Sequence, residues 1–175
     1  MQSPPYRGTF YLIDMATEKF SFEYEVYNSA EELSKEDAYL LQLAKDVADT
    51  AYAPYSKFNV GAAAKMLNGA IVKGTNQENA SYPVGICAER SLMAAAGTIF
   101  PNEAIETMAI TYHNLNGSSD TPASPCGMCR QYIREYETRT HHPIRLILAG
   151  KEGKVYIIPQ ANMLLPLGFT SEDLK

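Results

Sequence analysis

The chain has 175 residues, of which 46% are hydrophobic and 20% are charged, so it is long enough for one ordinary domain with a single core. No apolar run approaches the ~20 residues that would cross a membrane, and a net charge of −5 without a basic cluster argues against binding a phosphate backbone. The first residues lack the basic start and the apolar stretch of a secretory signal. We therefore expect a soluble, cytoplasmic protein that acts on small neutral molecules.

The start of the chain differs in character from the rest. We expect residues 1–32 to form an N-terminal extension and residues 33–175 to form the domain. Residues 9–14 are apolar and β-branched, and residues 20–27 alternate between apolar and polar side chains, which is typical of a half-buried strand. Together these two segments predict a hairpin that turns near residues 16–17.

The remaining elements follow from the hydrophobic periodicity of the sequence. After Ser34, which begins a capping pattern, apolar residues recur at helical spacing until Pro54 stops the run. An Asn-Gly pair at residues 68–69 predicts a tight turn between two antiparallel strands. The other predicted elements are strands over residues 60–67, 70–73, 105–112, 144–149 and 155–158, and helices over residues 88–98 and 131–138. Strands that alternate with helices indicate an α/β fold, here a three-layer α/β/α sandwich around a mixed five-stranded sheet.

Three cysteines, Cys87, Cys126 and Cys129, occupy two short segments, and Glu89 stands beside the first of them. Three thiolate ligands and one carboxylate are what a catalytic zinc site needs, because such a site leaves one coordination position open and requires a proton carrier. If a helix begins at Gly127, Cys126 and Cys129 lie on one face of its first turn. Cys87 and Glu89 are two residues apart, which does not share a helix face, so we place Cys87 at the cap position of its helix.

The predicted metal site needs positive charge nearby. Three thiolates on one Zn²⁺ leave a net charge of −1, which weakens the ion as a Lewis acid toward water. Two helix N-termini point at the predicted site, each with about half a positive charge, and Arg90 follows the carboxylate directly. We expect Arg90 and these helix N-termini to offset the negative charge of the thiolates. The long loop over residues 114–125 leads into the second pair of cysteines, and long ordered loops are often functional.

Other interpretations of these residues are open at this level. A lone Cys-x-x-Cys pair is often half of a structural zinc site or a redox pair, and isolated cysteines in a cytoplasmic protein are often core residues. A structural site would normally have a fourth Cys or His ligand. The three histidines, however, have no ligand spacing to the cysteines: they are His113, His141 and His142. A redox pair would need neither Cys87 nor Glu89, although Glu89 could be a carboxylate that only stabilises a helix N-terminus.

Four widely spaced blocks of sequence together carry a resemblance to a known family. They are Tyr-Ser-Lys-Phe at residues 55–58, Asn-Gln-Glu-Asn-Ala-Ser-Tyr at 76–82, Cys-Ala-Glu-Arg at 87–90 and Pro-Cys-Gly-Met-Cys-Arg-Gln at 125–131. With these blocks, the chain resembles the small, single-domain, three-cysteine type of cytidine deaminase from about residue 33 to residue 174. Residues 1–32 lie outside the resemblance, and Gln77 stands where the family usually has a small apolar residue.

The resemblance implies an enzyme that deaminates cytidine and 2′-deoxycytidine to uridine and 2′-deoxyuridine, with release of ammonia, in pyrimidine salvage. One Zn²⁺ per subunit would be held by Cys87, Cys126 and Cys129 and would activate a water molecule. Glu89 would take a proton from this water and would pass protons to N3 and to the amino group of the cytosine.

The resemblance also implies how the nucleoside is bound. Asn76 and Glu78 would hydrogen-bond the ribose 3′-hydroxyl, and Phe58 would pack on the pyrimidine. From the residues alone, Phe58 could equally be an ordinary core residue, and the two polar residues could belong to a turn. The family further implies a homotetramer in which a neighbouring subunit completes each active site. The residues that would serve a neighbour's site are Ala80, Tyr82 and Phe169.

Three other functions stay open. A deaminase of nucleoside antibiotics, of the blasticidin type, would share the three-cysteine site and is the main alternative, although the block at residues 76–82 fits free nucleosides better. A polynucleotide-editing deaminase would need a basic, aromatic-lined groove, which this acidic chain does not predict. A non-enzymatic, zinc-stabilised binding module would need a fully ligated metal.

Overall fold

The computed structural model describes residues 16–175, so the strand predicted over residues 9–14 lies outside the described residues. Its helices and strands alternate along most of the chain, as predicted. The elements are β1 (Glu25–Tyr27), η1 (Ala30–Glu32), α1 (Lys35–Ala48), β2 (Phe58–Met66), β3 (Ile71–Thr75), η2 (Tyr82–Val84), α2 (Ala88–Ile99), β4 (Ile105–Asn114), α3 (Gly127–Thr140), β5 (Arg145–Ala149), β6 (Val155–Ile158), η3 (Ala161–Leu164) and η4 (Ser171–Leu174). Every helix within residues 16–175 is too short or too polar to cross a bilayer.

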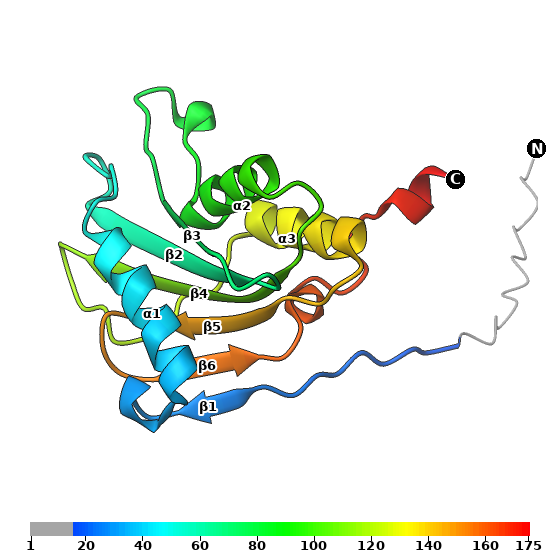
Figure 1. The fold of residues 1–175 in the computed structure, drawn as a ribbon, viewed down its shortest axis with the longest axis horizontal. Coiled ribbons are helices and arrows are strands. Elements are labelled where there is room, and N and C mark those ends of the chain that lie inside the picture. The colour runs from blue at the N-terminus through cyan, green and yellow to red at the C-terminus, as the bar shows by residue number, and fades with distance from the viewer. Residues whose placement is uncertain (1–15) are drawn as a thin grey trace, which may run out of the picture.

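The strands form one mixed sheet in the order β1-β6-β5-β4-β2-β3 (Figure 1). Neighbouring strands are antiparallel except β4 and β5, which are parallel and are connected through α3. The prediction of a mixed sheet in an α/β fold is confirmed. The predicted count of five strands was wrong, because the sheet has six strands: β1, from the N-terminal extension, pairs with the edge of β6.

The N-terminal extension does not form the predicted hairpin within the described residues. Only Glu25–Tyr27 is a strand, and Glu25 lies opposite Ile157 of β6 rather than opposite an earlier part of the extension. Residues 16–24 have no regular secondary structure, and they leave the sheet as an extended segment (Figure 1). The ring of Tyr24 nevertheless packs edge-on against Tyr156, with the ring centroids 5.2 Å apart. Within the described residues, the end of the alternating pattern therefore contacts the edge of the sheet at β6.

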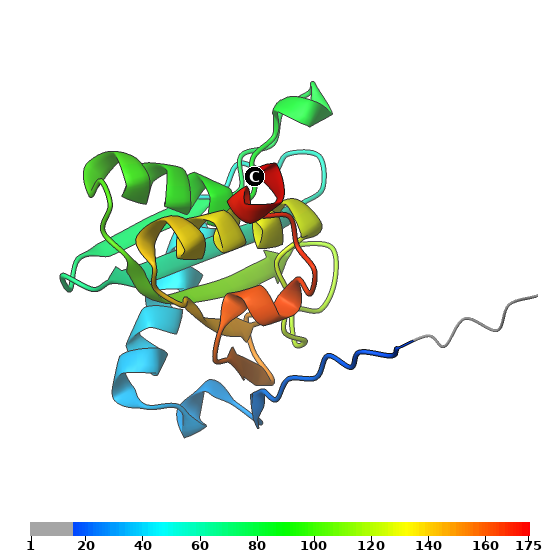
Figure 2. The same cartoon turned by 90° about the vertical axis from the view of Figure 1, so that its right-hand side faces the viewer.

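Helices cover both faces of the sheet, with α1 on one face and α2 and α3 on the other (Figures 1 and 2). Because successive residues of a strand point to opposite faces, each central strand contributes to both layers. In β4, Met108 and Ile110 pack in the core under α2 and α3, whereas Ala109 packs in the core under α1. The predicted three-layer α/β/α sandwich is confirmed.

The first long helix ends earlier than the sequence predicts. α1 begins after Ser34, whose hydroxyl accepts a backbone N–H of the first turn, as the capping pattern indicates. It ends at Ala48, although the apolar periodicity continues toward Pro54. Beyond the helix, Tyr52 pairs with Gln77 in an isolated β-bridge, so the chain leaves the helix to pair with the segment that follows β3.

The topology brings the starts of α2 and α3 to one edge of the sheet. β3 and β4 both run antiparallel to β2, so they are parallel to each other and their carboxyl ends lie at the same edge. α2 follows β3, and α3 follows β4. In α/β proteins, ligands bind at the carboxyl ends of such strands, so this edge is where a functional site is expected.

Candidate active site

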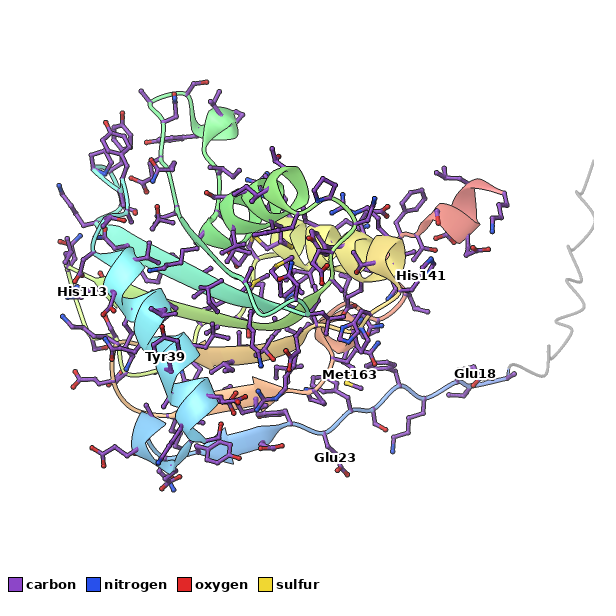
Figure 3. The ribbon with its side chains drawn as sticks, in the orientation of Figure 1. Glu18, Glu23, Tyr39, His113, His141 and Met163 are labelled. Carbon is purple, nitrogen blue, oxygen red and sulfur yellow. The ribbon has the colours of Figure 1, made fainter. Side chains whose placement is uncertain are left out.

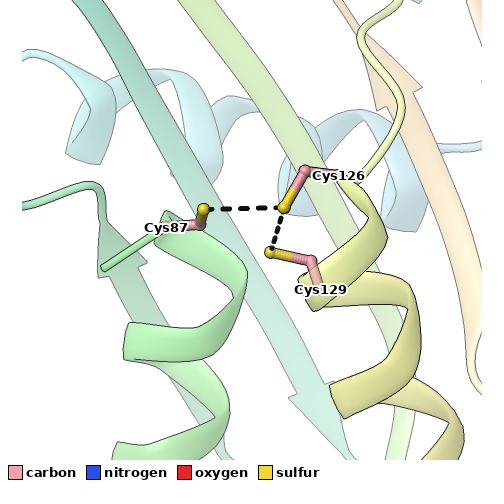
Figure 4. Close-up of side chains that lie close together, drawn as sticks. All are labelled: Cys87, Cys126 and Cys129. Carbon is pink, nitrogen blue, oxygen red and sulfur yellow. Dashed lines mark hydrogen bonds between the residues drawn. The ribbon is translucent and has the colours of Figure 1, made fainter. Parts of the chain in front are cut away.

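The three cysteines meet at the starts of α2 and α3 (Figure 4). Cys87 and Cys126 are the N-cap residues of these helices, and both have an extended backbone. Cys129 is buried in the first turn of α3. The predicted cap position of Cys87 is therefore confirmed. α3 begins at Gly127, earlier than the predicted start at residue 131, and this places Cys126 and Cys129 at one helix start as the spacing requires.

The sulfur positions fit one zinc ion. Sγ of Cys126 lies 3.8 Å from Sγ of Cys87 and 3.5 Å from Sγ of Cys129, and all three sulfurs lie within 4.8 Å of one another. Sulfurs bound tetrahedrally at the usual Zn–S distance of about 2.3 Å are about 3.8 Å apart. The residues present thus match the first three ligands of a tetrahedral Zn²⁺ without rearrangement of the backbone.

Histidines do not join this group of ligands in the described part of the chain. His113 lies near one end of the molecule and His141 near the other (Figure 3). Nδ1 of His113 is 3.7 Å from a carboxylate oxygen of Asp49, on the far side of the sheet from the cysteines' helices. Within residues 16–175, the only group of His, Cys, Asp and Glu that could hold a metal ion consists of the three cysteines. Three protein ligands are typical of a catalytic zinc site, whereas a structural site normally has four.

The environment of the sulfurs favours one thiolate, on Cys87. A hydrogen bond from the Cys129 thiol is the main cause that lowers the pKa of Cys87 to about 5, and the Arg90 guanidinium acts in the same direction. Donating this hydrogen bond raises the pKa of Cys129 itself. The first negative charge of the group therefore lies on Cys87, at the N-terminus of α2, and the binding of a metal ion would displace the remaining thiol protons.

Arg90 lies where the sequence places it, beside the sulfurs. Its Nη2 donates to the carbonyl of Gly85 at 3.2 Å, and its Nε is buried without a hydrogen-bond partner in the described residues. Its charge contributes to the low pKa of Cys87. A direct contact with a metal-bound thiolate stays a prediction.

Glu89 lies in the first turn of α2 and is only 5% exposed. Burial raises the pKa of its carboxyl, and negative charge on Cys87 acts in the same direction. A raised pKa makes the carboxyl a better proton acceptor than an ordinary glutamate, which suits a general acid and base. A carboxylate that only stabilises a helix N-terminus has no need of such burial.

One pocket, with a volume of about 1060 Å³, opens onto Cys87, Cys126 and Glu89. Its walls come from the start of β2, the segment that follows β3 and the loop that precedes α3. Most residues that the sequence assigned to nucleoside binding or to charge tuning line this same pocket. These residues are Phe58, Asn76, Glu78, Tyr82 and Arg90.

Phe58 forms an aromatic wall of the pocket. Its ring stacks on Tyr112 of β4, with the centroids 4.6 Å apart and the ring planes 12° apart. Tyr112 is 8% exposed, so it fixes the orientation of Phe58 from behind. The sequence did not reveal this support, because Phe58 and Tyr112 are far apart in the chain and meet only through the pairing of β2 with β4.

Asn76 and Glu78 each use half of their polar side chain to hold the backbone. Oδ1 of Asn76 accepts the N–H of Val60 at 2.8 Å, and its Nδ2 donates to the carbonyl of Phe58 at 2.9 Å. Oε2 of Glu78 accepts the N–H of Tyr55 at 2.9 Å. One amide hydrogen of Asn76 and Oε1 of Glu78 remain for a ligand. The pocket therefore offers one donor and one acceptor, from residues two positions apart in the chain.

Two of the residues predicted to serve a neighbouring subunit lie outside the pocket of their own chain. Ala80 is exposed, and Phe169 is 56% exposed, with its carbonyl held by Nε2 of Gln131 at 2.8 Å. Tyr82 lines the pocket rim but is 79% exposed, on the η2 segment that projects beyond the sheet (Figures 1 and 2). Their roles stay predictions.

The sequence did not identify the residues that the loop before α3 adds to the pocket. The loop was recognised as functional from its length and position, but no pattern singled out the side chains that line the pocket wall. These are Asn114, Asn116, Ala123 and Ser124. The dipeptide Ser124-Pro125 directly before Cys126 is the one sequence signal that could have pointed to this wall.

Comparison with known proteins agrees with this site. The family model for the cytidine and deoxycytidylate deaminase zinc-binding region matches residues 34–142. The chain is 33% identical over 136 residues to a cytidine deaminase of Halalkalibacterium halodurans, and the match covers 78% of this chain and 96% of the relative. It is 38% identical over 130 residues to a cytidine deaminase of Mycoplasma pneumoniae, and the match covers 74% of this chain and 90% of the relative.

Comparison of the fold with solved structures indicates the same family. The crystal structure of cytidine deaminase from Burkholderia pseudomallei matches with a TM-score of 0.66 and 33% sequence identity, and the match covers 78% of this chain and 100% of that chain. The matched family, the shared fold and a three-cysteine centre that fits one zinc ion all agree. The chain therefore belongs to the cytidine deaminase family of zinc-dependent hydrolases.

Proposed function

We propose that the protein hydrolyses cytidine and 2′-deoxycytidine to uridine and 2′-deoxyuridine, with release of ammonia. The observation that carries this proposal is the buried carboxyl of Glu89, which lines the same 1060 Å³ pocket as Cys87 and Cys126. A buried acid and base beside an incompletely ligated metal is the equipment of hydrolytic deamination. The relatives named cytidine deaminase support a cytosine nucleoside as the substrate.

Bound zinc, held by Cys87, Cys126 and Cys129, would supply Lewis-acid activation of a water molecule. Glu89 takes a proton from the attacking water and gives a proton to N3 of the cytosine ring while the water oxygen adds to C4. The same carboxyl then takes the proton of the new hydroxyl on C4 and passes it to the amino group, which leaves as ammonia. The C4–N bond breaks and a C4 carbonyl forms, so one water is consumed for each ammonia released.

The nucleoside would be oriented from both ends. The pyrimidine would pack against Phe58, which Tyr112 holds in place from behind. The 3′-hydroxyl would donate to Glu78 and accept from Asn76, because the free acceptor and the free donor on these residues match the two hydrogen-bonding roles of a hydroxyl. Arg90 and the two helix N-termini would offset the charge of the thiolates.

The wider setting follows from the family and belongs to the same proposal. We expect a cytoplasmic homotetramer that acts in pyrimidine salvage, in which Ala80, Tyr82 and Phe169 reach a neighbour's site. The large exposed areas of Tyr82 and Phe169 support this arrangement. We also propose residues 1–32 as an N-terminal extension of a catalytic domain over residues 33–175, since the family match begins at residue 34.

The direct test is the loss of ultraviolet absorbance when zinc-loaded protein is mixed with cytidine or 2′-deoxycytidine, together with a measurement of ammonia. We expect one ammonia for each nucleoside converted. 3′-Deoxycytidine should react far more slowly, because its binding leaves Asn76 and Glu78 without their partner. Deamination of a blasticidin-type nucleoside without deamination of cytidine would instead support the antibiotic deaminase.

A further inference from the structure

Ser119 fixes the loop over residues 115–125 to the body of the protein midway along its length. The ends of the loop are held separately: the N–H of Leu115 donates to the carbonyl of Lys57 at 2.9 Å, and the carbonyl of Pro125 accepts from Nε of Arg130 at 2.8 Å. Ser119 is 5% exposed, although the residues on either side of it are exposed. Its Oγ accepts the backbone N–H of Asn114, the last residue of β4, at 2.8 Å. Its carbonyl accepts the N–H of Glu152 at 3.2 Å, in the turn between β5 and β6. Ser119 thus connects the loop to the end of β4 through its buried hydroxyl and to the turn between β5 and β6 through its carbonyl.

The turn between β5 and β6 is shaped to receive this loop. A Cβ added to Gly150 would lie 2.1 Å from the carbonyl oxygen of Ser119, so only glycine permits the observed approach. The carbonyl of Gly150 also accepts a hydrogen bond from the buried Thr111 hydroxyl at 2.9 Å, which fixes the turn to β4. A Cβ added to Gly153, whose φ is +81°, would lie 2.2 Å from the carbonyl oxygen of Asp120. Two close backbone contacts therefore hold Ser119 and Asp120 against the turn.

The loop lines the pocket on both sides of this fixed point. Before Ser119, Asn114 and Asn116 line the pocket, and after it, Ala123 and Ser124 line the wall next to the cysteines. The fixed point therefore lies between the two lengths of chain that form one wall.

The first part of the loop also reaches the residues proposed to bind the sugar. Nδ2 of Asn116 donates to the carbonyl of Ser56 at 3.4 Å. The N–H of Ser56 in turn donates to Oε2 of Glu78 at 3.3 Å. A chain of hydrogen bonds thus runs from the loop to the carboxylate that faces the pocket.

We propose that Ser119 is a positioning residue that sets the shape of the pocket wall and thereby the affinity for the nucleoside. The proposal deepens the proposed function and rests on it. Zinc and Glu89 are held by α2 and α3, not by the loop, so loosening the loop weakens the binding of substrate and transition state alike. Such uniform binding appears in KM and leaves kcat unchanged.

The test is the variant Ser119→Ala in the full-length, zinc-loaded protein. It removes the acceptor for the N–H of Asn114, so we expect KM for cytidine to rise about three- to tenfold, the factor that corresponds to one hydrogen bond. The value of kcat should stay within about twofold of wild type, because the chemistry depends on the helices. Zinc content should not change. Backbone amides in residues 114–125 should exchange hydrogen faster, whether or not substrate is present.

Ser118→Ala is the matched control, since the neighbouring Ser118 is exposed and its hydroxyl makes no hydrogen bond within residues 16–175. It should leave KM and hydrogen exchange at wild-type values. Gly150→Ala provides a second route, because the added methyl pushes the loop away from the turn, and it should raise KM in the same way.

Two outcomes would overturn the proposal: an unchanged KM with unchanged exchange in Ser119→Ala, or a fall in kcat with loss of zinc. If wild-type protein deaminates neither cytidine nor 2′-deoxycytidine, the proposed function fails instead. In that case the exchange comparison still decides whether Ser119 fixes the loop.

Discussion

Gly74 of β3 sets the position of α2 and therefore of Cys87 and Glu89. A Cβ added to Gly74 would lie 2.5 Å from the backbone N of Leu92 and 2.7 Å from the carbonyl oxygen of Ala88. Ala88 stands between the zinc ligand Cys87 and Glu89, the carboxyl proposed to be catalytic. The substitution Gly74→Ala should therefore disturb the site directly, although residue 74 does not line the pocket.

The size of the disturbance follows from these distances. Ordinary van der Waals contact requires about 3.5 Å, so the start of α2 must move by roughly 1 Å to accept the methyl group. Overpacking of this kind destabilises a protein by about 1–3 kcal/mol. A misplacement of about 1 Å at a catalytic group reduces the rate by about a hundredfold. We expect a folded Gly74→Ala variant with kcat/KM lowered by roughly that factor.

Gly69→Ala is the control that separates activity from stability. Gly69 has a φ of +83°, which costs an alanine about 1–2 kcal/mol, but a Cβ there meets no atom within 4 Å. Urea unfolding should give similar losses of stability for the two variants, and the cytidine assay should give a large loss of activity only for Gly74→Ala. Wild-type activity in a folded Gly74→Ala variant would refute the idea that β3 positions the site.

Three further predictions concern acid stability, substrate packing and the metal. Asp37 accepts two hydrogen bonds from Arg145, at 2.6 and 2.9 Å, which lower the pKa of Asp37. The contribution of this ion pair to the free energy of unfolding is present above the unfolded pKa of about 3.9 and is lost as the pH falls through the folded pKa. Urea unfolding of Asp37→Asn should therefore show a loss of about 1–2 kcal/mol at pH 7 that shrinks as the pH falls below about 3.9, whereas a loss that does not change with pH would contradict this role. Phe58→Leu should raise KM for cytidine about three- to tenfold through loss of aromatic packing, and an unchanged KM would remove Phe58 from the pyrimidine site. Removal of zinc with a chelator should abolish turnover and lower the unfolding midpoint. One equivalent of zinc per chain should restore both. Turnover in metal-free protein would contradict the proposed zinc chemistry.

The metal centre was predictable because its geometry is local. The spacing of Cys126 and Cys129 fixes their separation at a helix start, and the spacing of Cys87 and Glu89 excludes a shared helix face and so requires a cap. What the spacing could not show is that the two helix starts lie at one edge of the sheet. That depends on β3 and β4 both pairing with β2, which is a long-range property of the chain.

Other features could not be predicted because they depend on partners far away in sequence. The alternation over residues 20–27 is typical of a strand, but it does not say that β6 is the partner of residues 25–27, nor that residues 20–24 stay outside the sheet. The pocket wall is set by backbone atoms of Ser119 that approach Gly150. Neither residue belongs to a recognisable motif, and a glycine that permits a close approach has the same sequence signature as a glycine in any turn.

The most direct test of the central claim is the deamination of cytidine by Glu89→Gln with its zinc content measured. Glutamine has the size of glutamate and keeps the helix start intact, but it cannot carry a proton. We predict one zinc per chain in both proteins, ammonia release by wild type, and a rate lowered by a factor of about 10² or more in Glu89→Gln, the contribution typical of a general acid and base. A zinc-loaded Glu89→Gln variant that releases ammonia at the wild-type rate would contradict the account.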